Sequence, residues 1–163
     1  MKCLCFSDSH GDSYNIRRAL SMHPDAEVIF FLGDGLSDLE PFINDRKRAF
    51  LAVRGNWDTS AILGDNFVKN VDEITLLGHK IAFTHGNLHG VKQGLDGVIS
   101  LAKERKADAL LFGHTHIPLE KYLSEEGIYL FNPGSIGGHR PVGASYGVIN
   151  ITEDGILFSH GGI

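Results

Sequence analysis

The sequence Lys2-Cys3-Leu4-Cys5-Phe6-Ser7-Asp8-Ser9-His10 begins as a short apolar run and passes at once to two residues of metal-ligand type. Four later runs do the same: Val28–Leu32 leads to Asp34, Phe50–Val53 to Asn56, Ile81–Phe83 to His85, and Ala109–Phe112 to His114 and His116. Such runs, ending in glycine or a small polar residue, are typical of buried strands. Side chains at the carboxyl ends of several strands can meet in one crevice of an α/β sheet, so the pattern predicts a metal site there.

The first third of the chain alternates between strand and helix patterns. The predicted elements are a strand at Lys2–Phe6, a helix at Tyr14–Met22, a strand at Glu27–Leu32, a helical segment at Leu36–Ile43 and a strand at Phe50–Val53. This βαβαβ order predicts parallel strands with helices packed outside them.

The remainder of the chain is predicted to be mostly β. The expected strands are Phe67–Val71, Glu73–Leu77, Lys80–Phe83, Ala109–Phe112, Glu120–Leu123, Ile128–Phe131, Tyr146–Ile151 and Ile156–Ser159, with one helix at Gly94–Arg105 and a tight turn at Gly78-His79. No linker, repeat or low-complexity tract interrupts the sequence. We therefore expect an α/β fold in a single domain over residues 1–163, with two packed mixed β-sheets flanked by helices and the site at one edge.

Composition excludes several classes of protein. The chain of 163 residues has an apolar fraction of 42% and a charged fraction of 21%, as in soluble globular domains. Its formal charge of −5 and the lack of a long basic track argue against binding to long nucleic acid. No apolar run approaches the roughly 20 residues that span a bilayer, so no membrane is expected, and the start of the chain lacks a secretory pattern, which favours the cytoplasm. Cys3 and Cys5 are interpreted as small buried apolar residues.

The motifs DSH, GD, GN, TH and GHTH, in this order, resemble those of the calcineurin-like metallophosphoesterases. The short length, GHTH and the segment Asn132-Pro133-Gly134-Ser135 are similar to the small bacterial and archaeal phosphodiesterase subfamily, whose fold the eukaryotic retromer subunit Vps29 shares. The resemblance runs from Asp8 to beyond Ser135. It implies a four-layer α/β/β/α metallophosphoesterase sandwich.

The resemblance also implies two adjacent metal sites. It places one ion on Asp8, His10 and His116, a second on Asn56, His85 and His114, and Asp34 between them, with catalytic roles for Asp34, Asn56 and His85. Residues two apart in extended backbone point the same way, and a carboxylate has two oxygens, so the division is chemically sensible. Mixed nitrogen and oxygen ligands exclude calcium and suit manganese, our first choice, or iron, cobalt, nickel or zinc.

The implied reaction is the hydrolysis of a small phosphodiester, which makes the chain a hydrolase acting on ester bonds. A hydroxide bridging two divalent ions would attack phosphorus, because metal binding lowers the pKa of water to about 7. The alternatives are a Vps29-like scaffold for protein partners, and a phosphomonoesterase, nucleotidase or nuclease. A homodimer through an apolar edge of the second sheet is a further possibility.

Several positions depart from the family pattern and leave two interpretations open. Trp57 stands where many relatives have a histidine that protonates the leaving group, and it either walls the pocket or packs against the sheet edge. Asp58 either orients a ligand histidine or caps a helix before Ser60. Asn87 offers a hydrogen bond to substrate, and Arg140 contacts either a substrate phosphate or solvent.

The other expectations concern supporting residues. The segment Asn132–Ser135 either presents exposed amides near the site or ends a strand without contacting a ligand. The five remaining histidines are assigned structural or solvated roles: His23, His79, His89, His139 and His160.

Overall fold

The computed structural model describes residues 1–138 and 143–163, and these form two five-stranded sheets and one two-stranded hairpin. The first sheet has the order β12-β11-β1-β2-β3. Its strands are β1 (Lys2–Phe6), β2 (Val28–Phe31), β3 (Ala49–Ala52), β11 (Ser145–Thr152) and β12 (Gly155–Gly162). β1, β2 and β3 are parallel, as the βαβαβ pattern predicted, and β11 joins β1 in antiparallel register.

The second sheet has the order β6-β7-β8-β10-β9. Its strands are β6 (Val71–Leu76), β7 (His79–Thr84), β8 (Ala109–Phe112), β9 (Leu119–Leu123) and β10 (Ile128–Asn132). The three central strands are parallel, and β6 and β9 are antiparallel at the two edges. Both sheets are therefore mixed.

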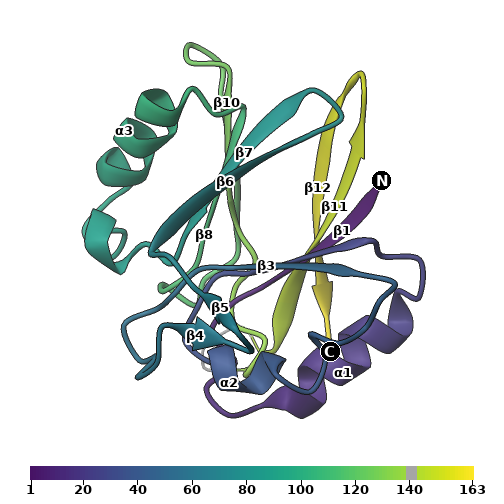
Figure 1. The fold of residues 1–163 in the computed structure, drawn as a ribbon. Coiled ribbons are helices and arrows are strands. Elements are labelled where there is room, and N and C mark those ends of the chain that lie inside the picture. Colours follow the sequence, from purple (N-terminus) through teal and green to yellow (C-terminus); the bar gives the residue numbers. More distant parts are fainter. Residues whose placement is uncertain (139–142) are drawn as a thin grey trace.

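Helices cover the outer faces of both sheets, which gives the expected α/β/β/α layering (Figure 1). α1 (Ser13–Met22) and α2 (Leu36–Leu39) pack on the first sheet, and α3 (Asp96–Arg105) packs on the second. α1 begins where the Asp12 side chain accepts a hydrogen bond from the Asn15 amide at 3.0 Å. Its buried residues are Ile16, Ala19 and Leu20, which form one apolar stripe toward the sheet.

The apolar strands are explained by burial on both faces. In β1, Cys3 and Cys5 lie in the core between the two sheets, and Leu4 and Phe6 lie in the core under α1 and α2. A strand covered on both sides has no need of alternating polar residues, so it is a continuous apolar run. Both cysteines are free and buried, as expected, and burial raises the pKa of the Cys3 thiol to about 12.

The region after β3 differs from the prediction. The expected strand at Phe67–Val71 is wrong: the chain instead forms a short hairpin of β4 (Ile62–Leu63) and β5 (Asn66–Phe67), and leaves the ladder before β6. Phe67 is exposed, and the Val68 amide returns to the Ala61 carbonyl at 2.7 Å. The apolar residues of this segment lie in and beside a turn, and the spacing of apolar residues along the sequence does not indicate such a turn.

Two further boundaries are corrected. The helix expected over Leu36–Ile43 ends at Leu39, because Pro41 has no amide hydrogen with which to continue the helical ladder. The tight turn lies at Leu77-Gly78, not Gly78-His79, and both of its residues have positive φ, 49° and 89°.

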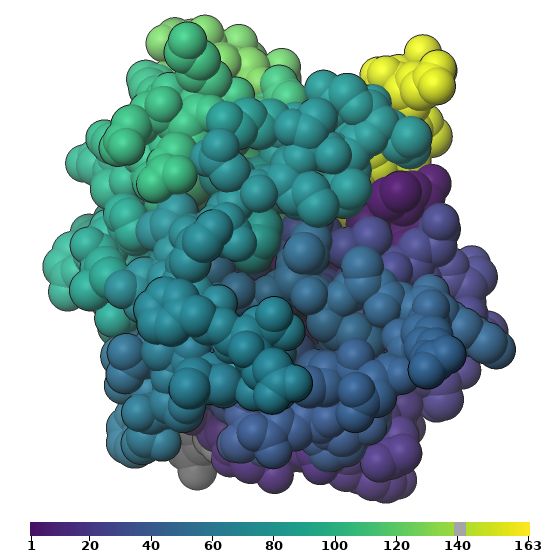
Figure 2. Space-filling model, viewed as in Figure 1, coloured from purple at the N-terminus to yellow at the C-terminus, as the bar shows by residue number. Residues whose placement is uncertain are grey.

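In space-filling form, the teal atoms of the β4–β5 hairpin adjoin the blue atoms of the α2 segment on one face of the molecule (Figure 2). Among the described residues, no helix is both long and apolar enough to cross a bilayer.

Candidate metal centre

The loops that follow β1, β2, β3, β7 and β8 bring the seven predicted ligand residues together. Two groups of possible ligands form, with the ligand atoms of each group within 4.8 Å of one another. The first group is Asp8, His10 and His116, and the second is Asp34, His85 and His114. The motifs implied the same grouping of the four histidines, but they placed Asp34 between the groups, whereas distance places it in the second. Asn56 is located by its contact with His85.

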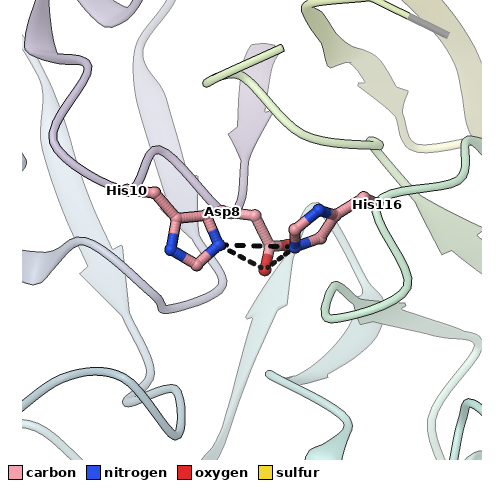
Figure 3. Close-up of side chains that lie close together, drawn as sticks. All are labelled: Asp8, His10 and His116. Carbon is pink, nitrogen blue, oxygen red and sulfur yellow. Dashed lines mark hydrogen bonds and ion pairs between the residues drawn. The ribbon is translucent and has the colours of Figure 1, made fainter. Parts of the chain in front are cut away.

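In the first group, three ligand atoms converge on one point (Figure 3). His116 Nε2 lies 3.1 Å from Asp8 Oδ1, and His10 Nε2 lies 3.8 Å from the same oxygen. The two imidazole Nε2 atoms are 3.3 Å apart. The side chains come from loops 106 residues apart along the chain, so only the tertiary fold assembles them.

In the second group, His85 Nε2 is the common neighbour. It lies 3.1 Å from His114 Nδ1, 3.3 Å from Asp34 Oδ2 and 3.2 Å from Asn56 Oδ1. His85 Nδ1 is 2.7 Å from the Leu32 carbonyl oxygen, to which its N–H can donate. In that tautomer the Nε2 lone pair faces the centre, as in a metal-ligating histidine held by its other ring nitrogen.

Asp34 stands between the two groups. Its Oδ2 is 3.3 Å from His85 Nε2 and 3.9 Å from His10 Nε2. Its Oδ1 instead accepts the Trp57 amide hydrogen at 2.8 Å. Asp34 thus directs one oxygen, Oδ2, toward residues of both groups, whereas the sequence argument relied on both carboxylate oxygens.

The hydrogen bonding of the buried Asp8 carboxylate indicates whether these residues suit a metal. Asp8 Oδ2 accepts hydrogen bonds from the Ser7 hydroxyl at 2.5 Å and the His114 amide at 3.0 Å. Asp8 Oδ1 is buried and accepts no hydrogen bond from the described residues. A buried carboxylate oxygen without a donor is costly, and a cation would satisfy it. Together with the imidazoles around it, this oxygen fits a divalent transition metal.

The charges of the centre shift the pKa of its groups. Burial lowers the pKa of His85, but the hydrogen bond that protonated His85 donates to Asp34 and the charges of Asp8 and Asp34 outweigh burial and raise it. Burial raises the pKa of Asp34, but the contacts with His85 and the Trp57 amide outweigh it and lower the pKa. A metal ion at His85 would therefore compete with a proton for Nε2.

The ligand residues hold an uncommon backbone conformation. Asp8, His10, Asp34, His114 and His116 all have φ between 47° and 67°. Residues other than glycine rarely adopt this left-handed region, and each such residue costs about 1–3 kcal/mol unless its surroundings stabilise it. The expectation of extended backbone was therefore wrong: the paired ligands converge through left-handed turns at strand ends.

Close packing explains the glycines that precede two ligands. Gly33 has a φ of 93°, and a Cβ there would lie 2.4 Å from the Gly55 nitrogen. A Cβ on Gly55 would lie 2.1 Å from Asp34 Oδ1. At Gly55 glycine is therefore required by the close approach of the two loops.

Asp58 fastens the loops that carry Asp34 and Asn56. Its buried carboxylate accepts four backbone N–H groups at 2.8–2.9 Å, and the donors are Asp34, Gly35, Leu36 and Gly55. Neither earlier interpretation holds, because strand β4, and not a helix, follows Ser60, and no histidine contacts this carboxylate among the described residues. Asp58 is a positioning residue whose role sequence reasoning missed.

The segment Asn132–Ser135 supports the other side of the centre. Asn132 Nδ2 donates to the Gly113 carbonyl and to Thr115 Oγ1, each at 3.0 Å, and the Ser135 hydroxyl donates to the Asp8 carbonyl at 2.8 Å. The segment is buried, so the expectation of exposed amides is wrong. Asn132 ends strand β10, as the other interpretation expected, and the absence of a ligand contact stays a prediction. The segment holds the loops of both ligand groups.

Three residues were proposed to contact substrate. Trp57 is 73% exposed and meets the His10 ring edge-on, with 6.1 Å between centroids. It lines a cleft of about 880 Å³ together with His10 and Asp34, so it walls the pocket. Asn87 begins the short helix η1 (Asn87–His89) and does not line this cleft. Arg140 lies outside the described residues.

Comparison with known proteins agrees with this geometry. A model of the calcineurin-like phosphoesterase superfamily domain matches residues 1–154. The chain is 34% identical over 155 residues to the probable metallophosphoesterase YsnB of Bacillus subtilis, covering 94% of this chain and 86% of YsnB. It is 28% identical over 172 residues to the phosphodiesterase YfcE of Escherichia coli K12, covering 92% and 88%.

A solved structure matches the fold closely. A Vps29 single mutant from Entamoeba histolytica superposes with a TM-score of 0.80 and 18% identity, covering 98% of this chain and 91% of that one. At this identity the likeness shows the fold alone. The match of the family model over residues 1–154 and the 34% identity to YsnB show that the chain belongs to the calcineurin-like phosphoesterase superfamily.

Proposed function

We propose that this protein is a phosphodiesterase that uses two divalent ions to hydrolyse a small phosphodiester. The observation that carries the proposal is the position of Asp34 Oδ2, which is 3.3 Å from His85 Nε2 and 3.9 Å from His10 Nε2. Two ligand groups that share one carboxylate oxygen are the arrangement expected of a two-metal hydrolytic site. The name of its relative YfcE, a phosphodiesterase, supports the choice of a diester substrate.

The proposed ligands follow the two groups. One ion would be held by Asp8, His10 and His116, the other by Asn56, His85 and His114, with Asp34 bridging them. Manganese is our first choice, and iron, cobalt, nickel or zinc also suit nitrogen and oxygen donors. When bound, the ions would supply an acidified water as nucleophile and positive charge for the phosphoryl oxygens.

Neighbouring groups of the protein orient two of the proposed ligands, Asp34 and His85. The Trp57 amide holds Asp34 Oδ1 at 2.8 Å and thereby turns Oδ2 toward both groups. Asp58 fixes the Asp34 amide at 2.9 Å, and the Leu32 carbonyl fixes the ring of His85 at 2.7 Å. Because the Trp57 indole cannot donate a proton at ordinary pH, we expect esters with acidic alcohols to react faster than alkyl esters.

Metal content and diester hydrolysis test the proposal. The purified protein is analysed for bound metal after exposure to manganese, and its rate is measured on bis(p-nitrophenyl) phosphate and on p-nitrophenyl phosphate. We expect two ions per chain and faster hydrolysis of the diester. One ion per chain contradicts the two-metal site, and a faster monoester favours a phosphomonoesterase. A chain that takes up no metal and hydrolyses neither ester supports the Vps29-like scaffold.

We also propose that the protein is located in the cytoplasm. The two free, buried cysteines agree with a reducing compartment. The possible homodimer stays a prediction, which the oligomeric state in solution tests.

A further inference from the structure

His10 lies on the open side of the metal centre, on the loop that follows strand β1. Its side chain is 19% exposed, whereas Asp8 on the same loop is fully buried. Its ring nevertheless points toward Asp8 and His116 (Figure 3). The backbone of His10 has a φ of 47° and that of Gly11 a φ of 97°, so two successive residues are left-handed. Because such a conformation is costly by itself, contacts with other segments must hold this loop.

The carboxylate of Asp38 binds the residues on both sides of His10. Asp38 Oδ2 accepts the Ser9 hydroxyl hydrogen at 2.5 Å and the Gly11 amide hydrogen at 2.8 Å. Ser9 is fully buried, which shelters its hydrogen bond from water. Hydrogen bonds that a carboxylate accepts are stronger than those between neutral groups. The two bonds therefore fix the backbone before and after His10, and with it the direction in which the imidazole leaves the chain.

Helix α2 holds Asp38 in place. Leu36 and Leu39 of this helix are buried, and the Asp38 amide donates to the Gly35 carbonyl at 2.9 Å. The helix begins directly after the loop of Asp34, whose carbonyl accepts the His10 amide hydrogen at 3.1 Å. Asp38 thus ties the loop of His10 to a segment that the core has already fixed.

Gly35 leaves the space that the hydrogen bond between Ser9 and Asp38 occupies. A Cβ at this position would lie 2.0 Å from Ser9 Oγ and 2.6 Å from Asp38 Oδ2. Any side chain here would therefore displace one partner of the bond. Gly35 also has a φ of 138°, which independently favours glycine. The contact is part of how the two loops pack.

We propose that Asp38 is a positioning residue for the ion of the first ligand group, and that it acts by holding the loop that carries His10. The inference rests on the proposed function, because His10 is one of the ligands proposed there. Asp58 holds a different part of the centre, since it binds the amides of Asp34 and Gly55. Loss of Asp38 should therefore weaken one ion selectively.

Titration of the metal-free protein with Mn²⁺ in a calorimeter tests the inference. Groups that orient ligands typically change metal affinity by roughly 10–100-fold, and in Asp38→Ala we expect a loss of about tenfold for one ion and no change for the other. His10→Ala identifies the binding step that belongs to the first group. In the His10→Ala background, Asp38→Ala should cost less than about twofold, because its effect passes through His10.

Matched variants separate positioning from general stability. Asp38→Asn keeps an oxygen that can accept both hydrogen bonds, so its affinity should stay within about threefold of the wild type. Ser9→Ala removes one of the two bonds and should fall between Asp38→Ala and the wild type. Asp12→Ala is the control, since Asp12 lies on the same loop but accepts two hydrogen bonds from Asn15, at 3.0 Å and 2.9 Å, at the start of α1. It should lower the midpoint of urea unfolding and leave both ion affinities unchanged.

A measurement without metal separates this inference from the proposed function. Trp57 is the single tryptophan, and the centroids of its ring and the His10 ring are 6.1 Å apart. In metal-free protein we expect a nuclear Overhauser effect between these rings in the wild type and in Asp12→Ala, and its loss in Asp38→Ala.

Three results overturn the inference: a ring contact that persists in Asp38→Ala, equal weakening of both ions, or an equal cost of Asp38→Ala with and without His10. A wild type that binds fewer than two ions instead contradicts the proposed function. In that case the contact between the rings of His10 and Trp57 still decides whether Asp38 positions His10.

Discussion

Replacing Asp58 by alanine should loosen the metal centre without touching a single proposed ligand. The carboxylate accepts the amides of Asp34, Gly35, Leu36 and Gly55, all within 2.9 Å. In Asp58→Ala these four donors lose their acceptor at once. The amide of Asp34 is the most important of them, because that residue stands between the two ligand groups.

The size of the effect follows from the number of donors lost. A hydrogen bond to a charged group contributes about 1.5–3 kcal/mol, so four of them give an upper limit of about 6–12 kcal/mol. The Gly35 bond is only part-buried, and water entering the space of the lost carboxylate would satisfy some of the donors. We therefore expect the free energy of unfolding to fall by about 3–5 kcal/mol, a large share of the roughly 5–15 kcal/mol typical of a domain.

Urea unfolding followed by circular dichroism measures the loss, and competition with a chelator measures metal affinity. Asp58→Asn is the graded variant, since one amide oxygen remains as acceptor, and it should lose about half as much. Asp154→Ala is the control at an exposed carboxylate. If Asp58→Ala unfolds at the same urea concentration as the wild type and holds metal equally well, Asp58 does not position this centre.

Three other predictions address the ligands, the packing and the pH dependence. Asp34→Ala should lose both metal ions together, as measured by metal analysis, and a variant that retains two ions would show that Asp34 does not bridge. Gly55→Ala places a Cβ 2.1 Å from Asp34 Oδ1, so it should destabilise the fold by at least about 2 kcal/mol in urea, and wild-type stability would contradict the close approach. Burial, and then the charge of Lys2, lowers the pKa of His23, so protonation opposes folding, and stability should fall as the pH drops below the unfolded value of about 6.5. His23→Gln removes that group, and urea unfolding at pH 7 and pH 5 should then show a smaller difference than in the wild type.

Local sequence determined most of the architecture. Strands buried on both faces must be apolar throughout, so β1, β2 and β8 stand out as runs that end where the ligands begin. The types and order of the proposed ligand residues also follow from the sequence alone, because only a few side chains bind transition metals. The family, the layers and the parallel strands could therefore be predicted before any contact was known.

The tertiary structure decided what depends on contacts between distant loops. The left-handed backbone of Asp8 and His116, the single oxygen with which Asp34 faces both groups, and the four amides held by Asp58 join segments that no local pattern relates. The sequence analysis missed the hairpin at residues 62–67 for the same reason. The pairing of its two short strands depends on the turn between them and not on the spacing of apolar residues. Periodicity reports which face of an element is buried, but the geometry of a site depends on how separate elements meet, and that is fixed only when the two sheets pack.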